Sequence, residues 1–450
     1  MPRILLSLFF YLIFQTAFAQ EFTAEETRED LAFLRKSIQT YNPALYTYNP
    51  DFDAASEQIT QEVDGEPVSL IAYFQKVSRM CALSNEGHFK LGDWQDTVHQ
   101  PFMDFRYRYM PFSIKLISGR FYVDEDYSSE QLMKKGDQIL EINGRKPSEI
   151  LHSFYPYLCS DGHIKTYPNL QIESGFPWLY YLYIEQPESF TLTVQHQGTP
   201  ARKVLVKAIA KDQQVENYKK YVAPFREALQ PEDAFYTLTH TDHYSMLTLP
   251  SFDYRVIEKY GVKATRLYKN IFKELQEKGV QRLVIDLRNN TGGRNEFAFE
   301  MIPFILKNDH GDEFMKKSVS WEGKEREYRL PRASKYLFKG DIYVFVNGKT
   351  YSAGHSLARY LVEYGNAVAI GEESGTRYEG FAAGSTQYVT LPSSQIGIGI
   401  PRYLNYYPSS GKQTTKNRGL LPSQAISYTL EDWLNNKDPY LEKLSILLKD

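Results

Sequence analysis

The chain has 450 residues, 42% of them hydrophobic, and a formal net charge of −3 at pH 7. A chain of this length exceeds what one hydrophobic core normally holds, so we expect two or three domains. The near-neutral charge, with no block of lysine and arginine, excludes a typical nucleic-acid-binding protein, because a phosphate backbone attracts concentrated positive charge.

Residues 1–19 have the pattern of a signal peptide. Arg3 precedes an apolar run at 4–14, and the segment closes on AFA at 17–19, the small-x-small pattern of a cleavage site. An uncleaved anchor helix is the alternative, but the run is shorter than the roughly 20 apolar residues of a membrane span. We therefore expect an exported protein, periplasmic or extracellular, that begins at Gln20 and has no stable membrane span after cleavage.

Two cysteines, Cys81 and Cys159, are the only thiols of the chain. Two cysteines cannot build a disulfide framework, even in an exported protein. We expect buried free thiols or one incidental bridge.

The pattern of the first part of the mature chain is helical. Leu31, Leu34 and Ile38 recur at helix spacing, as do apolar residues at 70, 73, 74 and 77. These patterns predict a small helical N-terminal domain over residues 20–98.

Between residues 99 and 210 the apolar residues recur at the spacing of β-strands. The string FSIKLI at 112–117, Gly119 and FYV at 121–123 predict a hairpin. The string KGDQILEING at 135–144 predicts a strand closed by an Asn-Gly turn, and it resembles the corresponding stretch of PDZ domains. The alternative is an ordinary hairpin in an unrelated β-rich insert.

Beyond a polar linker at 211–219, strand and helix patterns alternate up to residue 450. Apolar strands are predicted at 244–249, 283–287, 342–346 and 367–370, with helices at 267–275, 297–305 and from Ser352 to Gly365. Such alternation is typical of parallel β-α-β units in an α/β fold. An amphipathic helix is predicted at 433–448.

Two turns of this region carry the chemistry. The string DLRNNTGG at 286–293 follows one strand, and NGKTYSAG at 347–354 follows the next and places Ser352 at the start of a helix. Ligands of open α/β sheets bind beyond the carboxyl ends of the strands. Amides of Gly292, Gly293 and Ala353 can there hold an oxyanion, and Ser352 has the position of a nucleophile or, more simply, of a helix N-cap.

The strings VIDLRNNTGG and, about sixty residues later, VFVNGKTYSAG resemble the paired signature of the carboxy-terminal processing (tail-specific) and tricorn-core serine peptidases. The resemblance continues in EGHF at 86–89 and NRGLLP at 417–422 and so extends over nearly the whole mature chain. It implies a ClpP/crotonase-like core over 211–450, a PDZ-like domain at 99–210 that captures peptide ends, and peptide or protein substrates cleaved in unstructured or C-terminal segments.

The resemblance also implies a base for Ser352. One branch of the family uses a lysine about twenty-five residues after the serine, but Arg377 stands there and stays protonated. The tricorn-like branch uses a histidine ahead of the PDZ domain, which matches His88. His88 is therefore the predicted base.

Three other groups of histidines compete with His88. His163 lies in SDGH inside the insert, and His240 and His243 flank a core strand. His355, three residues after Ser352, shares its helix face, although a structural role is favoured.

The family pattern is incomplete at the third member of the catalytic network. Lys416 replaces a glutamate of the tricorn-like members, and Ser423 replaces an aspartate. Glu372 or Glu373 could substitute. The alternative function is a peptide-binding protein on the same fold with weak or no turnover.

The remaining charged residues of the signature have simpler interpretations. Asp286 and Arg288 are expected to fix a strand end, because charged pairs there are more often structural than catalytic. No metal-ligand spacing, phosphate loop or dinucleotide fingerprint occurs in the sequence, so no cofactor or metal is implied. The oligomeric state stays open.

Overall fold

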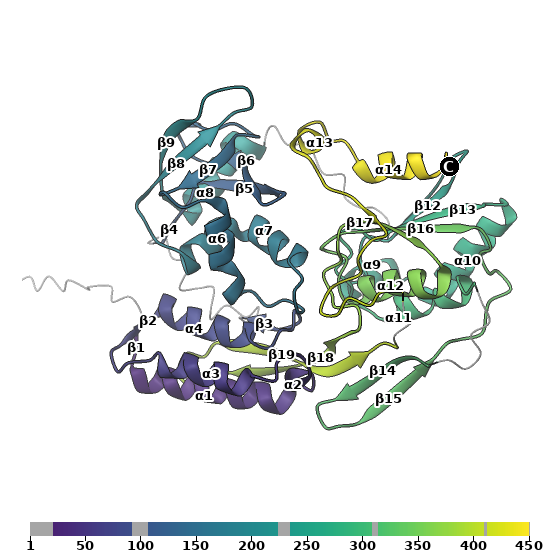
Figure 1. The fold of residues 1–450 in the computed structure, drawn as a ribbon, viewed down its shortest axis with the longest axis horizontal. Coiled ribbons are helices and arrows are strands. Elements are labelled where there is room, and N and C mark those ends of the chain that lie inside the picture. The colour runs from purple at the N-terminus through teal and green to yellow at the C-terminus, as the bar shows by residue number, and fades with distance from the viewer. Residues whose placement is uncertain (1–20, 92–106, 224–234, 308–313, 409–411, 450) are drawn as a thin grey trace, which may run out of the picture.

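The computed structural model describes residues 21–91, 107–223, 235–307, 314–408 and 412–449. The predicted signal peptide lies outside these residues. Figure 1 shows the N-terminal helices and a β-rich insert on one side of the molecule, the core sheet on the other, and strands β18 and β19 running between them.

The core is a six-stranded sheet in the order β11-β12-β13-β16-β17-β20. All neighbours are parallel except the pair of β11 and β12. The predicted parallel α/β arrangement is therefore confirmed. The bounds are β11 Thr237–His240, β12 Ser245–Thr248, β13 Arg282–Asp286, β16 Asp341–Val346, β17 Val368–Gly371 and β20 Gln424–Ala425.

Helices cover both faces of this sheet because its strands are apolar on both faces. Leu283 and Ile285 pack with helices α10 (Ala264–Glu277) and α12 (Ala353–Gly365). The intervening Val284 packs with α14 (Pro439–Leu447) on the opposite face. Gly279 ends α10 with φ 62°, as its position after the apolar stripe predicts.

Three predicted segments differ from the structure. The helix expected at 297–305 is only α11 (Glu296–Phe299) and a 3-10 turn (Ile302–Phe304), because Pro303 has no N–H to continue an α-helix. The helix expected at 433–448 is split into α13 (Leu430–Leu434) and α14, which begins anew with the Asp438 cap and Pro439. The linker expected at 211–219 is helical, with α8 at Lys211–Asn217.

The N-terminal region is helical, as predicted. Thr23 and Ser69 cap two of its helices through their side-chain oxygens. Two short strands that are far apart in the sequence, Glu21–Phe22 (β1) and Val68–Ser69 (β2), form an antiparallel pair in this region. The helices are α1 Ala24–Tyr41, α2 Leu45–Tyr48, α3 Phe52–Gln61 and α4 Leu70–Ala82.

A second, antiparallel sheet connects this region to the core, and the sequence did not predict it. Its order is β15-β14-β19-β18, with β3 (Lys90–Leu91) paired to β19 at Ile398 and Gly399. That pairing attaches the segment that follows His88 to the second sheet. The bounds are β14 Phe314–Ser320, β15 Glu325–Arg329, β18 Gly380–Thr390 and β19 Gly397–Tyr406.

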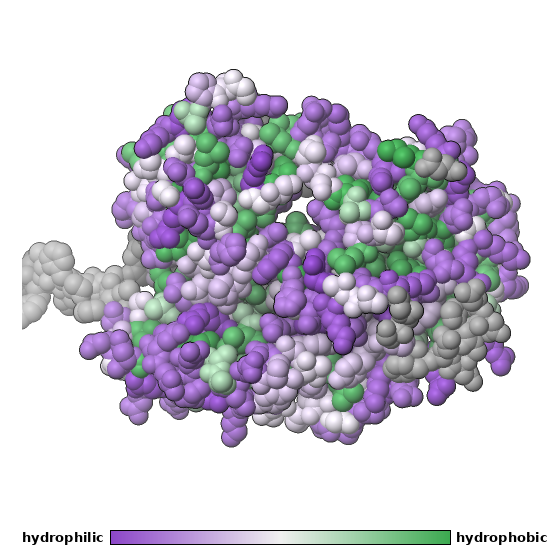
Figure 2. Space-filling model, in the orientation of Figure 1, coloured by the Kyte–Doolittle hydropathy of each residue, from purple (hydrophilic) through white to green (hydrophobic). Residues whose placement is uncertain are grey.

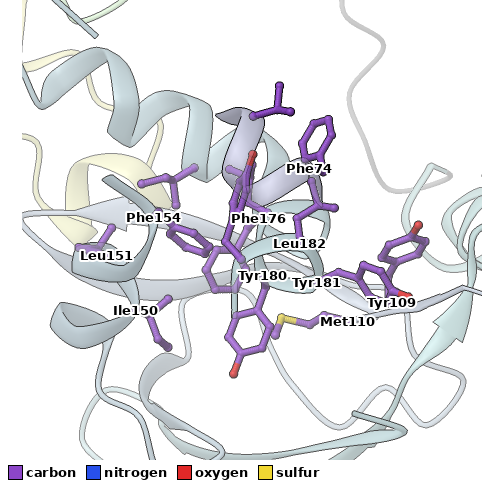
Figure 3. Packing of buried hydrophobic residues seen from close by; sticks show 14 of the residues in the cluster. Phe74, Tyr109, Met110, Ile150, Leu151, Phe154, Phe176, Tyr180, Tyr181 and Leu182 are labelled. Atoms are coloured by element: carbon purple, nitrogen blue, oxygen red, sulfur yellow. The ribbon is translucent and has the colours of Figure 1, made fainter. Parts of the chain in front are cut away.

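The β insert, defined here as residues 107–210, is a five-stranded antiparallel sheet in the order β5-β6-β7-β8-β9. The predicted hairpin and the strand before Asn143 are confirmed. Its helices α6 (Pro147–Phe154) and α7 (Thr166–Tyr183) bring aromatic residues together with Phe74 of α4, so the insert and the N-terminal region share one core (Figure 3). The bounds are β5 Phe112–Ile117, β6 Arg120–Asp126, β7 Gln138–Ile142, β8 Ser189–Gln195 and β9 Arg202–Lys207.

Candidate active site

Ser352 lies between β16 and α12 in a strained backbone conformation. Its φ of 51° and ψ of −121° are rare for a residue with a side chain. Its N–H donates to Thr376 Oγ1 at 2.8 Å, but its own side chain makes no capping hydrogen bond. The simpler interpretation of Ser352 as a helix cap is therefore not what the structure shows. Strain of this kind, about 1 to 3 kcal/mol, is typical of functional positions such as the strained turn of a nucleophile elbow.

The glycine turn after β13 packs directly on Ser352. A Cβ on Gly292 would lie 2.8 Å from Ser352 Cβ and 2.7 Å from the Ala353 nitrogen, so only glycine fits. Gly292 N–H already donates to Asn290 Oδ1 at 2.9 Å. Within the described residues, the N–H groups of Gly293 and Ala353 have no hydrogen-bond partner, so these two remain available to an oxyanion.

Asn290 joins the two turns. Its carbonyl accepts a hydrogen bond from Tyr351 N–H at 3.0 Å, and its side-chain amide donates to the Leu249 carbonyl at 2.8 Å. The glycine turn and the serine turn are thus fixed to each other by one buried side chain and its backbone.

His88 packs on the serine turn through Tyr351, and among the described residues no hydrogen bond joins it to Ser352. Its Nδ1 is 3.1 Å from the hydroxyl of Tyr351, the residue before Ser352, and its buried Nε2 has no partner among the described residues. Burial lowers the pKa of His88 to about 4, although the Asp161 charge opposes this shift. The ring is therefore neutral at pH 7, as a proton acceptor must be.

His88 is one of four stacked aromatic rings, and the other three fix its orientation. Its ring lies between Phe381 of β18, at 5.3 Å and 9°, and Tyr351, at 4.6 Å and 26°. Tyr167 of α7 stacks on the far side of Tyr351 at 4.4 Å and 12°. The β insert, the serine turn and the second sheet each contribute a ring.

Arg377 organises the segment that carries His88. Its fully buried guanidinium donates to Glu86 Oε1 at 2.9 Å and to the Asn85 carbonyl at 2.6 Å, and it stacks on Tyr48 at 3.5 Å. Burial raises the pKa of Glu86 to about 8, and the Arg377 charge opposes that rise. The residue at the position of the lysine base thus has a structural role.

In the string DGH at 161–163, the aspartate lies at the site and the histidine does not. Asp161 is buried and accepts hydrogen bonds from Gly87 N–H at 2.6 Å and Arg377 N–H at 3.0 Å. His163 is exposed and donates its backbone N–H to the Asn417 carbonyl. The spacing of residues in the sequence could not have shown that Asp161 contacts Gly87 in the fold.

Neither proposed third member contacts His88. Both carboxylate oxygens of Glu373 bind Arg418, at 2.7 and 2.6 Å. Glu372 lines a cavity of about 220 Å³ between the β insert and the core (Figure 2 shows a hollow between these parts). Burial raises the pKa of Glu372, and the Lys115 charge opposes that rise. Lys416 is exposed.

The other candidate histidines are in positions that do not suit a base for Ser352. His355 is fully buried, its Nδ1 is 2.7 Å from Ser374 Oγ, and burial lowers its pKa to about 3. His240 is bound to Ser245 and Glu274. His243 is exposed in the turn after β11.

The charged residues of the first signature form a strand-end ion pair. Arg288 binds Asp286 at 2.6 Å and Asp438 at 2.8 Å, which attaches the start of α14 to the sheet. In the described ranges, no three His, Cys, Asp or Glu side chains are grouped to hold a metal. No helix of the described chain is long and apolar enough to cross a membrane.

Comparison with known proteins identifies the core. Residues 243–437 match the model of peptidase family S41. These residues form an S41 peptidase domain. The chain is a serine-type peptidase. No curated protein matches the sequence.

Two solved structures, both of mature CPAF, share the fold of this chain. Mature CPAF is 14% identical, with a TM-score of 0.66 over 95% of this chain and 97% of that one. Mature CPAF complexed with lactacystin gives the same identity and TM-score over 95% and 98%. The photosystem II D1 C-terminal processing protease, 13% identical over 89% and 93%, has a TM-score of only 0.43. At these identities the likeness concerns the fold alone.

Proposed function

We propose that this S41 peptidase is an exported endopeptidase in which Ser352 attacks the peptide carbonyl and His88 accepts its proton. The observation that supports this most is the strained backbone of Ser352, which packs on Gly292. The neutral imidazole of His88 contacts Tyr351, the residue before Ser352. A half-buried serine whose hydroxyl has no hydrogen-bond partner among the described residues, a glycine turn packed on it and a nearby imidazole form an arrangement that suits acyl transfer.

The oxyanion of the tetrahedral intermediate is bound by the N–H groups of Gly293 and Ala353. Both groups lie in the two turns at Ser352 and have no described partner, whereas Gly292 N–H is engaged by Asn290. Each such donor contributes about 3 to 4 kcal/mol in serine peptidases. Gly292 serves instead to let the two turns approach.

The substrate is an unstructured or C-terminal segment of a protein. The β insert resembles a PDZ domain in its GDQILEING string and lies beside the catalytic turns through Tyr167, so a peptide end held there is close to Ser352. The signal-like pattern of residues 1–19 supports export to the periplasm or medium.

The second candidate is a peptide-binding protein with little turnover. It is favoured by the missing hydrogen bond between His88 and Ser352 and by the exposed Lys416 in place of a glutamate. In unliganded sites such bonds are often long and shorten only with substrate, so the peptidase remains the better proposal.

The test is covalent labelling by a fluorophosphonate together with cleavage of an unstructured fluorogenic peptide. Wild type is expected to label and cleave, Ser352→Ala to do neither, and His88→Gln to lose both in large part. His355→Gln should retain turnover if His88 is the base. Tight binding of intact peptide by an unlabelled wild-type chain would instead establish the second candidate.

A further inference from the structure

The Nδ1 side of His88 faces a hydroxyl where serine peptidases usually have a carboxylate. Tyr351 Oη is 3.1 Å from Nδ1, and no carboxylate in the described residues is hydrogen-bonded to either ring nitrogen. The two stacked neighbours of this pair, Phe381 and Tyr167, prevent either ring from turning. The contact is therefore a fixed part of the site.

Tyr351 is neutral in this position. It is fully enclosed, and burial together with the nearby Asp161 charge raises its pKa well above the ordinary value of a phenol. A neutral hydroxyl can accept one hydrogen bond from an imidazole N–H. Which nitrogen of a neutral histidine keeps the proton is decided by such a partner.

We propose that Tyr351 is the positioning residue of His88 and takes the place of the missing carboxylate, a role that rests on the proposed function. The Nδ1–H of His88 donates to Tyr351 Oη, so the lone pair of Nε2 is free to accept the Ser352 hydroxyl proton. When Ser352 Oγ bonds to the substrate carbonyl carbon, its proton moves to Nε2 and the ring becomes imidazolium. Tyr351 keeps its own proton throughout.

Asp161 supplies the negative charge that stabilises this imidazolium from a distance. Its two oxygens are engaged by the N–H groups of Gly87 and Arg377, so it cannot turn to the ring. It nevertheless lies close to both rings, since a Cβ on Gly87 would be 3.3 Å from Asp161 Oδ1 and 2.5 Å from Tyr351 Oη. The hydroxyl thus orients the ring while the buried carboxylate provides the charge.

The test removes one hydroxyl and preserves the stack. Tyr351→Phe is expected to lower kcat by about 10- to 10⁴-fold, the range for losing the correct tautomer, with KM within about twofold. Tyr157→Phe is the matched control outside the site, because Tyr157 also stacks on a tyrosine, Tyr183, at 4.3 Å and 7°, and its hydroxyl has no hydrogen bond among the described residues. It should keep wild-type kcat and thermal stability.

A second measurement does not depend on turnover. Nitrogen-15 NMR of the full chain with labelled histidine, assigned by His88→Gln, should show His88 of wild type protonated at Nδ1 and a mixed or reversed tautomer in Tyr351→Phe. A wild-type ring protonated at Nε2, or Tyr351→Phe with wild-type kcat, would overturn the proposal. If Ser352→Ala were as active as wild type, the proposed function would fail instead, and the spectra would still report on the tautomer.

Discussion

The imidazole of His88, the proposed base, is kept neutral by its surroundings. Burial lowers its pKa to about 4, and a histidine accepts a proton only while it is unprotonated. We therefore expect kcat/KM to stay level as the pH falls from 7 to about 5 and to drop only near pH 4, rather than near the ordinary value of about 6.5.

This profile is measured with a peptide substrate that has no group titrating in that range. Far-ultraviolet circular dichroism at each pH serves as the control, since protonation of buried histidines also favours unfolding. An acid limb centred near pH 6.5 would show that the catalytic base is in a wetter environment than His88.

Gly292 tests whether the close packing of the two turns is needed for activity. In Gly292→Ala the new Cβ would meet backbone and Cβ atoms of the serine turn at 2.7 to 2.8 Å, so Ser352 must move. We expect labelling by a fluorophosphonate to fall at least about a hundredfold, because small misplacements of a nucleophile have effects of this size.

The matched control is Gly279→Ala, which also has a positive φ but open space around its Cβ. It should lose only about 1 kcal/mol of stability and label normally. Equal labelling of the two variants would mean that the contact of Gly292 with Ser352 does not matter.

The sequence predicted those parts of the site that lie within one short string. Ser352 and the glycine turn were identified because strand, turn and helix are adjacent along the chain. The sequence did not predict that Tyr351 and Asp161 lie near His88. Tyr351 is 263 residues from His88 along the chain, and Asp161 is 74 residues from Gly87, to which it is hydrogen-bonded. No local pattern encodes such pairings.

At the scale of elements, the buried pair of Arg377 and Glu86 attaches the His88 segment to the loop before β18. Both side chains have 0% exposure. Removing one member of a buried pair leaves an uncompensated charge, so Arg377→Ala is expected to lower the free energy of unfolding by about 3 to 5 kcal/mol and to abolish turnover.

The comparison variant is Lys273→Ala, which breaks an exposed pair with Glu277 on α10. Urea unfolding should show a change of less than about 1 kcal/mol there. Arg377→Lys adds a further check. If lysine at this position raised kcat and moved the acid limb to higher pH, position 377 would be a base site rather than a structural one.

Element prediction succeeded where periodicity was strong and one-sided. The core strands are continuous apolar runs, and α10 has an apolar stripe bounded by a glycine, so both could be predicted. Strands β14, β15, β18 and β19 were missed because their exposed and buried residues do not alternate regularly, as register shifts in β14 and β18 show. Their pairing with β3 is also long-range and has no signature in the sequence.

At the scale of the whole molecule, the core of the N-terminal helices and the β insert extends into strand β19 and the turn before it, while the parallel sheet has hydrophobic clusters of its own. One hydrophobic cluster contains residues from Phe22 to Ala208 together with Leu391, Ile396, Ile398 and Ile400 of the S41 domain. Strands β18 and β19 therefore connect the helices that precede His88 to the sheet that holds Ser352 (Figure 1). The second sheet thus joins the segment of His88 to the segment of Ser352.

Asp30 of α1 tests this connection, because it is fully buried and binds the turn between β18 and β19. Its carboxylate accepts hydrogen bonds from the N–H groups of Ser393 and Ser394, at 2.8 and 2.9 Å, and from the Tyr73 hydroxyl at 2.6 Å. Asp30→Ala removes the acceptor of two half-buried N–H groups and of the buried Tyr73 hydroxyl, so we expect a loss of about 2 to 4 kcal/mol. Because β18 and β19 contribute residues to the cores of both parts, calorimetry should show one transition at a lower Tm, and labelling of Ser352 should fail at the same temperature. Glu29→Ala, an exposed neighbour on the same helix, should change neither. A variant whose helices melt first while Ser352 still labels would show instead that the N-terminal region unfolds independently of the peptidase.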